Sequence, residues 1–233
     1  MYNFRKPGVS AMSSYVISDL HGCFEKFSKM LSTINFTDRD TLYILGDIID
    51  RGPDSLKIID FIVCKKNIVW IKGNHEELFE DYCETGDGSL WFYNGGKSTF
   101  EEISKRGLDF QNCLYEYIRK LPLYKVVDKF ILVHGGLYLP KNYLSMHINY
   151  ILQEQDSSFV LWDRSGVHDE RVLDNYTIIC GHTPVQTITN DYKNPPAILH
   201  RNGRIFIDCG CCFKNSNGLL ACLRLDDMME FYV

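Results

Sequence analysis

Aspartate, histidine and asparagine residues recur in this sequence directly after short apolar runs. They are Asp19, His21, Asp47, Asn74, His134 and His182. Carboxylates supply charge and can bridge two divalent ions, imidazoles supply nitrogen donors, and an amide oxygen completes a coordination shell without adding charge. Any one of these histidines alone would more often be an ordinary polar residue. Together with His75, however, four of the seven histidines follow such runs, which predicts a pair of mixed nitrogen and oxygen metal sites.

The three imidazoles in this ligand set favour transition metals, because Mg²⁺ and Ca²⁺ prefer shells made of oxygen. We expect two divalent ions, with manganese first and iron or zinc as alternatives. Two metal ions about 3.5–4 Å apart can activate a bridging water and clamp the attacking and leaving oxygens of a phosphoryl transfer.

Three further residues fit the same chemistry. Arg51 follows a strand end, and a guanidinium can bind two phosphate oxygens at once. His75 adjoins the predicted ligand Asn74 and could act as a general acid for the leaving group, while Asp50 orients the imidazole and keeps it protonated. A surface ion pair beside a turn is the alternative interpretation of Asp50 and Arg51.

The apolar runs that carry these residues predict buried strands. They are short, rich in β-branched and aromatic residues, and end in polar residues or glycine, at 15–17, 42–45, 68–71, 130–133 and 176–180. Apolar residues recur at helical spacing over 24–34 and 56–63, and Pro53 suits a first helical turn. Alternating strands and helices predict a layered α/β fold, in which ligands bind beyond the carboxyl ends of the strands.

Two regions differ from this pattern. Residues from about 76 to 120 are rich in glutamate and then in aromatic residues and glycine, and we expect a helical insertion over one edge of the site. The segment from Ala197 onward predicts strands with a turn at Asn202-Gly203, and hairpins that close a second sheet. We expect a loose lead-in at 1–12 and one domain over 13–233.

Composition excludes several classes of protein. A net charge of −5 argues against a nucleic-acid partner, and the absence of a long apolar run argues against a membrane span. Without a signal peptide, the nine cysteines predict a cytoplasmic protein with reduced thiols. Cys209 and Cys212 form a C-x-x-C, but a zinc site would need a second pair, so buried strand-end cysteines are the expectation. The sequence assigns this cluster no role and predicts no oligomeric state.

Five motifs together resemble the signature series of the phosphoprotein phosphatase family of metallophosphatases. They are DLHG at 19–22, GDIIDRG at 46–52, GNHE at 73–76, HGG at 134–136 and GHT at 181–183, and they extend over most of the chain. Family members commonly have His-Ala-Gly where this chain has His-Gly-Gly. Within the family the sequence is most similar to short serine/threonine phosphatases of the bacterial and phage type, on WFYNGGKST at 91–99, LPL at 121–123 and LWDR at 161–164.

The resemblance implies an α/β/β/α sandwich with two central mixed sheets flanked by helices. It also implies that Asp19 and His21 hold one metal, that Asp47 bridges, and that Asn74, His134 and His182 hold the other. His75 would be the general acid with Asp50 behind it, and the phosphate would be bound by Arg51, Arg164 and Asn74. Arg164 could instead pair with Asp163 or Glu170.

The sequence therefore predicts a phosphatase acting on phosphoserine or phosphothreonine, in proteins or in small phosphoesters. A symmetrical dinucleoside tetraphosphate hydrolase is the alternative, because the tail at 207–212 and 218–226 resembles the closing strands of both groups. Those tetraphosphatases usually carry another residue where Asp50 stands. A non-catalytic metal-binding scaffold would not need His75 and Asp50, and the acidic balance disfavours a nuclease or phosphodiesterase.

Overall fold

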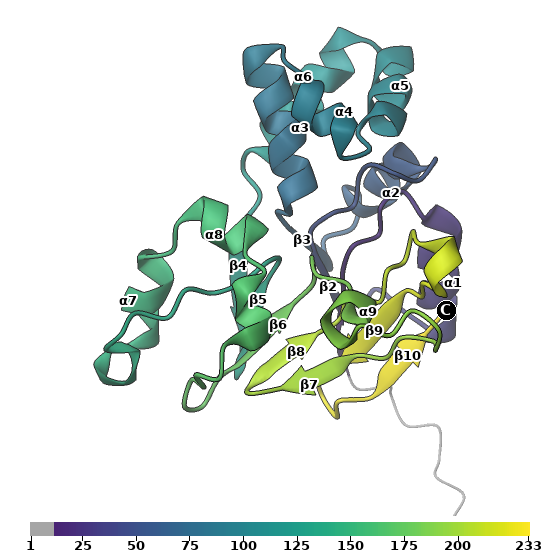
Figure 1. Ribbon diagram of the computed structural model, residues 1–233. Helices are drawn as coiled ribbons and strands as arrows, with labels where there is room; N and C mark the ends of the chain where they lie inside the picture. The colour runs from purple at the N-terminus through teal and green to yellow at the C-terminus, as the bar shows by residue number, and fades with distance from the viewer. Residues whose placement is uncertain (1–11) are drawn as a thin grey trace, which may run out of the picture.

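Two five-stranded sheets pack together at the centre of the molecule, and helices flank them and gather at one end (Figure 1). The computed structural model describes residues 12–233, so the predicted lead-in at 1–12, apart from Met12, lies outside the described residues. Both sheets mix parallel and antiparallel pairs. The predicted layered α/β sandwich is therefore confirmed.

The first sheet has the strand order β10-β9-β1-β2-β3. Its parallel strands are β1 (Ser14–Ile17), β2 (Thr41–Leu45) and β3 (Ile68–Ile71). Helix α1 (Phe24–Thr33) connects β1 to β2, and α2 (Ser55–Ile62) connects β2 to β3. Because the three strands are parallel, the loops that follow them meet at one edge of the sheet.

The second sheet has the order β4-β5-β6-β8-β7. Strands β5 (Phe130–Val133), β6 (Thr177–Cys180) and β8 (Arg204–Phe206) are parallel. The edge strand β4 (Tyr124–Val127) was not predicted, because Lys125 interrupts its apolar run and its two middle residues are exposed. Strand β7 (Leu199–Arg201) pairs with β8 through Asn202-Gly203, where φ angles of 49° and 66° give the left-handed turn typical of a two-residue hairpin.

The C-terminal strands divide between the two sheets. The prediction that they all close a second sheet was wrong for β9 (Ala221–Arg224) and β10 (Glu230–Tyr232), which extend the first sheet as β9 pairs antiparallel with β1. Apolar alternation predicts a half-buried strand but does not say which sheet it joins. The first and last parts of the described chain thus meet in one sheet, and a single domain over 13–233 stays a prediction.

Side chains alternate across the first sheet and so build two cores. Val16 of β1 packs between the sheets with Val133 of β5, whereas its neighbours Tyr15 and Ile17 pack on the opposite face with Phe27 of α1. This alternation follows from strand geometry, in which successive side chains point to opposite faces. Both faces of the sheet are covered, so the strand ends that carry the polar residues are held rigidly.

Four helices fill the region where a helical insertion was predicted. They are α3 (Asn74–Thr85), α4 (Ser89–Tyr93), α5 (Lys97–Arg106) and α6 (Leu108–Ile118), and they form the group at the top of Figure 1. The other helices are α7 (Ile148–Gln153), α8 (Ser157–Trp162) and α9 (Val185–Thr189). None of the helices in residues 12–233 has the length and hydropathy needed to cross a bilayer.

Candidate active site

The six predicted metal ligands lie close to the carboxyl ends of β1, β2, β3, β5 and β6. Their exposed fractions range from 0 to 5%, so the site is enclosed by protein. Strands of both sheets contribute, and a hydrogen bond between them helps to join the halves, since the His134 ring after β5 lies 2.7 Å from the Leu45 carbonyl of β2. The fold thus brings residues separated by more than 160 positions into one cluster: Asp19, His21, Asp47, Asn74, His134 and His182.

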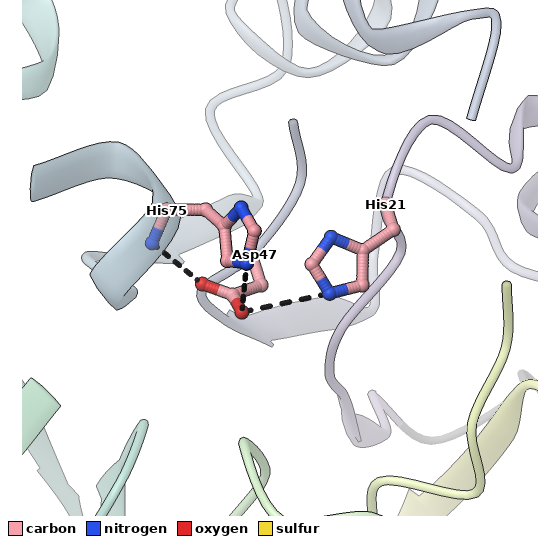
Figure 2. A group of neighbouring side chains, drawn as sticks. All are labelled: His21, Asp47 and His75. Atoms are coloured by element: carbon pink, nitrogen blue, oxygen red, sulfur yellow. Dashed lines mark hydrogen bonds and ion pairs between the residues drawn. The ribbon is translucent and has the colours of Figure 1, made fainter. Parts of the chain in front are cut away.

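Asp47 stands at the centre of this cluster. Its Oδ2 lies 3.6 Å from His21 Nε2, and its Oδ1 lies 3.3 Å from His134 Nε2. Figure 2 shows the first side, where the rings of His21 and His75 both face the Asp47 carboxylate. Two groups of donor atoms, each within 4.8 Å of one another, therefore share Asp47: one with His21 and His75, the other with His134 and His182. A carboxylate common to both groups is arranged to bridge two ions.

The imidazoles are held in the form that binds a metal. The Nδ1 atoms of His21 and His134 lie 2.9 Å from the Ile49 carbonyl and 2.7 Å from the Leu45 carbonyl. A carbonyl only accepts, so in the neutral form of each ring the proton is on Nδ1 and the lone pair of Nε2 faces Asp47. Burial lowers the pKa of His21 well below its usual value and that of His182 to about 2, which keeps both rings neutral. These residues fit a dinuclear centre.

Asp19 and Asn74 complete the cluster from opposite sides. The backbone N–H of His182 donates to Asp19 Oδ2 at 3.0 Å, which fixes the carboxylate beside the centre. Asn74 Oδ1 lies 2.9 Å from His134 Nε2, so both atoms point into the same space. Asp19 lies outside the two groups of donors that share Asp47, whereas His75, predicted as an acid, lies inside the first.

The backbone around the site is strained. Non-glycine residues rarely adopt positive φ, yet six site residues do so, at 43–74°. Such strain persists only where the surrounding structure enforces it, and it concentrates at functional sites. Gly46 shows how close the segments come, because a Cβ there would lie 2.5 Å from the Gly73 Cα. The six residues are Asp19, His21, Asp47, Asp50, Arg51 and His182.

His75 and Asp50 form a buried pair next to the metal cluster. His75 Nδ1 lies 2.6 Å from Asp50 Oδ2, and both side chains are at least 99% buried. Burial acts to lower the pKa of His75, but the carboxylates of Asp47 and Asp50 outweigh it and raise the pKa. The two carboxylates therefore favour the protonated imidazole, the form that a general acid requires.

The helical region holds this pair in place. Trp91 of α4 donates its indole N–H to Asp50 Oδ2 at 2.9 Å, and the Asp50 backbone N–H donates to Thr99 Oγ1 of α5 at 2.8 Å. The carbonyl of Gly95, between the two helices, accepts from the Arg51 backbone at 3.0 Å. Neither Trp91 nor Thr99 was predicted to have a role, although both belong to the WFYNGGKST segment at 91–99 that carries the family resemblance.

The two arginines adopt different positions. Arg51 reaches into the centre, with Nη1 2.6 Å from His21 Nε2 and Nη2 3.0 Å from His75 Nε2. Arg164 donates through Nη1 to the His182 carbonyl at 3.0 Å and to Thr183 Oγ1 at 3.2 Å. These contacts place Arg164 at the rim of the site rather than in the alternative ion pair with Asp163 or Glu170.

Two buried carboxylates were missed by the sequence analysis. Glu76 Oε2 accepts the backbone N–H groups of Asp47 and Gly73, both at 2.8 Å, and its Oε1 accepts that of Ile48 at 2.9 Å. Glu76 thus fixes the loops after β2 and β3 together, and its place three residues after Gly73 is the spacing of a capping box. Asp208 follows β8 just as the predicted ligands follow their strands. Burial raises the pKa of Asp208 well above its usual value, and the charge of Asp19 adds to this.

Glu76→Gln is expected to destabilise the protein by about 2–4 kcal/mol. The amide has one acceptor oxygen and directs its NH₂ at N–H donors, so buried donors lose their partner. Urea unfolding at neutral pH in the presence of chelator measures the effect on the protein alone. Glu101→Gln on exposed α5 is the matched control and should leave the unfolding midpoint unchanged. An unchanged midpoint for Glu76→Gln as well would mean that Glu76 does not hold the two loops.

The model of the family "Calcineurin-like phosphoesterase" matches residues 12–212. A symmetrical bis(5'-nucleosyl)-tetraphosphatase of Wigglesworthia glossinidia brevipalpis is 38% identical over 138 residues, which are 56% of this chain and 46% of that protein. Serine/threonine-protein phosphatase 2 of Salmonella typhimurium is 29% identical over 211 residues, which are 84% of this chain and 86% of that protein. The chain thus spans a little less than half the length of that tetraphosphatase.

Solved structures show the same fold. A metallophosphoesterase from Sphaerobacter thermophilus has a TM-score of 0.58 at 17% identity, covering 95% of this chain and 88% of its own. A protein serine/threonine phosphatase from Saccharomyces cerevisiae has a TM-score of 0.61 at 15% identity, covering 97% and 80%. The family match extends over most of the chain and contains every predicted metal ligand. This chain belongs to the calcineurin-like phosphoesterases.

Proposed function

We propose that this phosphoesterase hydrolyses phosphoserine and phosphothreonine, in proteins or in small phosphoesters. The observation that carries the proposal is the buried His75–Asp50 pair, with 2.6 Å between Nδ1 and Oδ2, beside the Asp47 cluster. An alkoxide leaving group has a high pKa and departs only when a proton reaches it, so a fixed and protonated acid matters most for alkyl phosphates. The similarity to serine/threonine-protein phosphatase 2 over 84% of the chain supports the same assignment.

The catalytic pair acts by holding and moving one proton. Asp50 fixes the His75 ring through Nδ1, so that Nε2 points towards the space beside Asp47, at 3.9 Å from its Oδ2. Trp91 holds the same carboxylate oxygen of Asp50 from the other side and prevents it from turning away. We infer that His75 Nε2 donates its proton to the leaving oxygen and that Asp50 stabilises the charged ring before this transfer.

The arginines bind the substrate's phosphate in this proposal. Arg51 lies with its guanidinium among the imidazoles, and a planar fork of donors matches two phosphate oxygens. Arg164 donates to the His182 carbonyl beside the second donor group, and Asn74 faces His134 of that group. In this proposal the two guanidiniums bind one phosphate from the two donor groups and orient the phosphorus for attack.

In this proposal one metal ion would be held by Asp19 and His21 and the other by Asn74, His134 and His182, with Asp47 shared. Members of this family use a dinuclear centre, and the two donor groups around Asp47 are able to hold metal ions. When bound, the ions would supply positive charge that lowers the pKa of water and offsets the charge of the phosphoryl group. The chain's own part is to hold the three imidazoles against backbone carbonyls and to fix the Asp47 loop through Glu76.

A symmetrical dinucleoside tetraphosphatase is the second candidate. It is favoured by the 38% identity to such an enzyme from Wigglesworthia glossinidia brevipalpis over 138 residues. A polyphosphate leaving group is already stable as an anion, so the His75–Asp50 pair contributes less to that reaction. The difference between the candidates is therefore one of substrate and not of the metal centre.

Side-by-side kinetics with manganese test the assignment. We expect kcat/KM for a phosphoserine or phosphothreonine peptide to exceed that for diadenosine tetraphosphate, with a phosphotyrosine peptide as the third substrate. The physical reason is the dependence of an alkoxide on the protonated His75. A clear preference for the tetraphosphate, with cleavage to two diphosphates, would assign the chain to the second candidate.

Removal of metal should abolish activity, and manganese should restore it better than magnesium or calcium. Three imidazole ligands favour a transition metal over ions that prefer oxygen shells. The measurement is activity on p-nitrophenyl phosphate after chelation and dialysis, with each metal added back and metal content determined in parallel. Full activity of a rigorously demetallated preparation in magnesium alone would contradict this ligand assignment.

A further inference from the structure

The loop at 210–218, which begins within the unassigned Cys209–Cys212 cluster, lies against Arg51. Lys26 of α1 anchors the loop, since its Nζ donates to the carbonyls of Cys211 at 2.8 Å and Gly218 at 2.7 Å. Inside the loop the Phe213 backbone N–H donates to the Gly210 carbonyl at 2.8 Å, and the Gly218 N–H donates to the Phe213 carbonyl at 3.1 Å. These bonds close the loop on itself and fix the direction of residue 213.

The loop presents two side chains to Arg51. The Arg51 guanidinium carbon lies 5.4 Å from the centre of the Phe213 ring, within the range of a cation–π contact. The Cys212 thiol also lies close enough to the Arg51 side chain to interact with it. Across from the loop, the Gly95 carbonyl holds the Arg51 backbone, and a Cβ on Gly95 would lie 2.8 Å from Arg51 Cγ. Arg51 is thus confined between the loop and the α4–α5 turn.

We propose that Phe213 is a positioning residue that holds the Arg51 guanidinium in the orientation that binds the substrate's phosphate. This inference rests on the proposed function, in which Arg51 binds phosphate. Phe213 is 39% exposed, so the hydrophobic core does not require it, and its ring is available to the cation. A ring against the flat face of a guanidinium leaves the N–H edges to donate to an anion.

Metal binding makes this contact more important. In the structure Arg51 Nη1 lies 2.6 Å from His21 Nε2, the nitrogen proposed to bind a metal ion. The guanidinium and a metal ion cannot both use that lone pair, so Arg51 must give up this partner when the metal binds. Phe213 and Cys212 then remain as its side-chain neighbours on the loop.

Binding of inorganic phosphate to the manganese-loaded protein tests the inference by calorimetry, without turnover. Phe213→Leu keeps an apolar side chain but removes the π face, and should raise the Kd of phosphate about 2- to 5-fold. KM for p-nitrophenyl phosphate should rise by a similar factor, with a smaller change in kcat. Phe213→Trp should restore tight binding, because indole is the best partner for a cation.

Two matched variants complete the experiment. Phe110→Leu removes a second Arg–aromatic contact, with Arg106 at 4.7 Å, that lies on α5 and α6 away from the phosphate pocket, and should leave phosphate binding unchanged. Arg51→Lys removes the bidentate fork and should raise the phosphate Kd about 10-fold or more. In the Arg51→Lys background, Phe213→Leu should then have little further effect, since both changes act on one interaction. Circular dichroism checks that each variant is folded, and Phe213→Met replaces the leucine variant if that one does not fold.

The outcomes separate this inference from the proposed function. If Arg51→Lys weakens phosphate binding and Phe213→Leu does not, Phe213 has no positioning role and the phosphate role of Arg51 stands. If Phe213→Leu weakens binding equally in both backgrounds, or if Phe213→Trp fails to restore it, Phe213 does not act through Arg51. If Arg51→Lys itself leaves phosphate binding unchanged, the proposed role of Arg51 is wrong, and the inference with it.

Discussion

His75→Asn is expected to lower kcat on a phosphoserine peptide by about 10²- to 10⁴-fold, the contribution typical of a positioned general acid, while both metal ions stay bound. The amide of Asn can form some of the hydrogen bonds of the ring, but it is not an acid and cannot transfer a proton. Asp50, 2.6 Å from the ring nitrogen, would lose its partner and keep its bond from Trp91. The effect should therefore fall on the chemical step.

The leaving group distinguishes proton donation from other roles of His75. With p-nitrophenyl phosphate, whose leaving group is stable without protonation, the loss should be much smaller than with the peptide. Asp50→Asn is the matched variant: it leaves the ring but removes its charged partner, and should show the same dependence on leaving group with a smaller total loss. Metal analysis shows whether His75 binds a metal ion instead, because His75 belongs to one of the donor groups around Asp47. A His75→Asn protein that has lost metal would make His75 a ligand rather than the acid.

The strands and the polar residues after them could be predicted from the sequence, because a short apolar run followed by a polar residue indicates both. Short apolar runs such as 42–45 and 68–71 are largely buried, and the polar residue that follows each run lies at the sheet edge, as Asp47 and Asn74 do. The family motifs reinforced this pattern. The candidate ligands could thus be named from local sequence patterns at five strand ends.

Contacts between distant segments could not be predicted in this way. No spacing rule shows that Trp91 reaches Asp50 across 41 positions, or that Phe213 lies against Arg51. These contacts depend on how the helical region and the loop at 210–218 pack onto the strands. For the same reason β9 could be predicted as a strand but not assigned to the first sheet, since its pairing with β1 spans nearly the whole chain.

Asp47→Asn is expected to remove metal from both halves of the centre and to reduce activity by at least about a hundredfold. Changing a residue that only supports a metal ligand already lowers metal affinity or activity about 10–100-fold. Asp47 is itself the carboxylate common to both donor groups. The fold should tolerate the change, because Asn adopts the left-handed conformation found at residue 47, with φ of 50°. The amide would turn either an NH₂ or a neutral oxygen towards His21 and His134, so the two ions would lose their shared negative charge.

Metal stoichiometry is the measurement that separates a bridge from an ordinary ligand. Asp47→Asn should bind less than one manganese ion per chain, whereas His182→Asn, which changes a ligand of only one group, should keep about one. Asp19→Asn is the corresponding variant for the ion proposed to bind Asp19 and His21. The Asp19 carboxylate accepts from the His182 backbone at 3.0 Å and lies outside the two groups that share Asp47. Loss of a single ion from Asp47→Asn would show that the carboxylate serves one metal only, because a bridging ligand cannot be neutralised without weakening both sites.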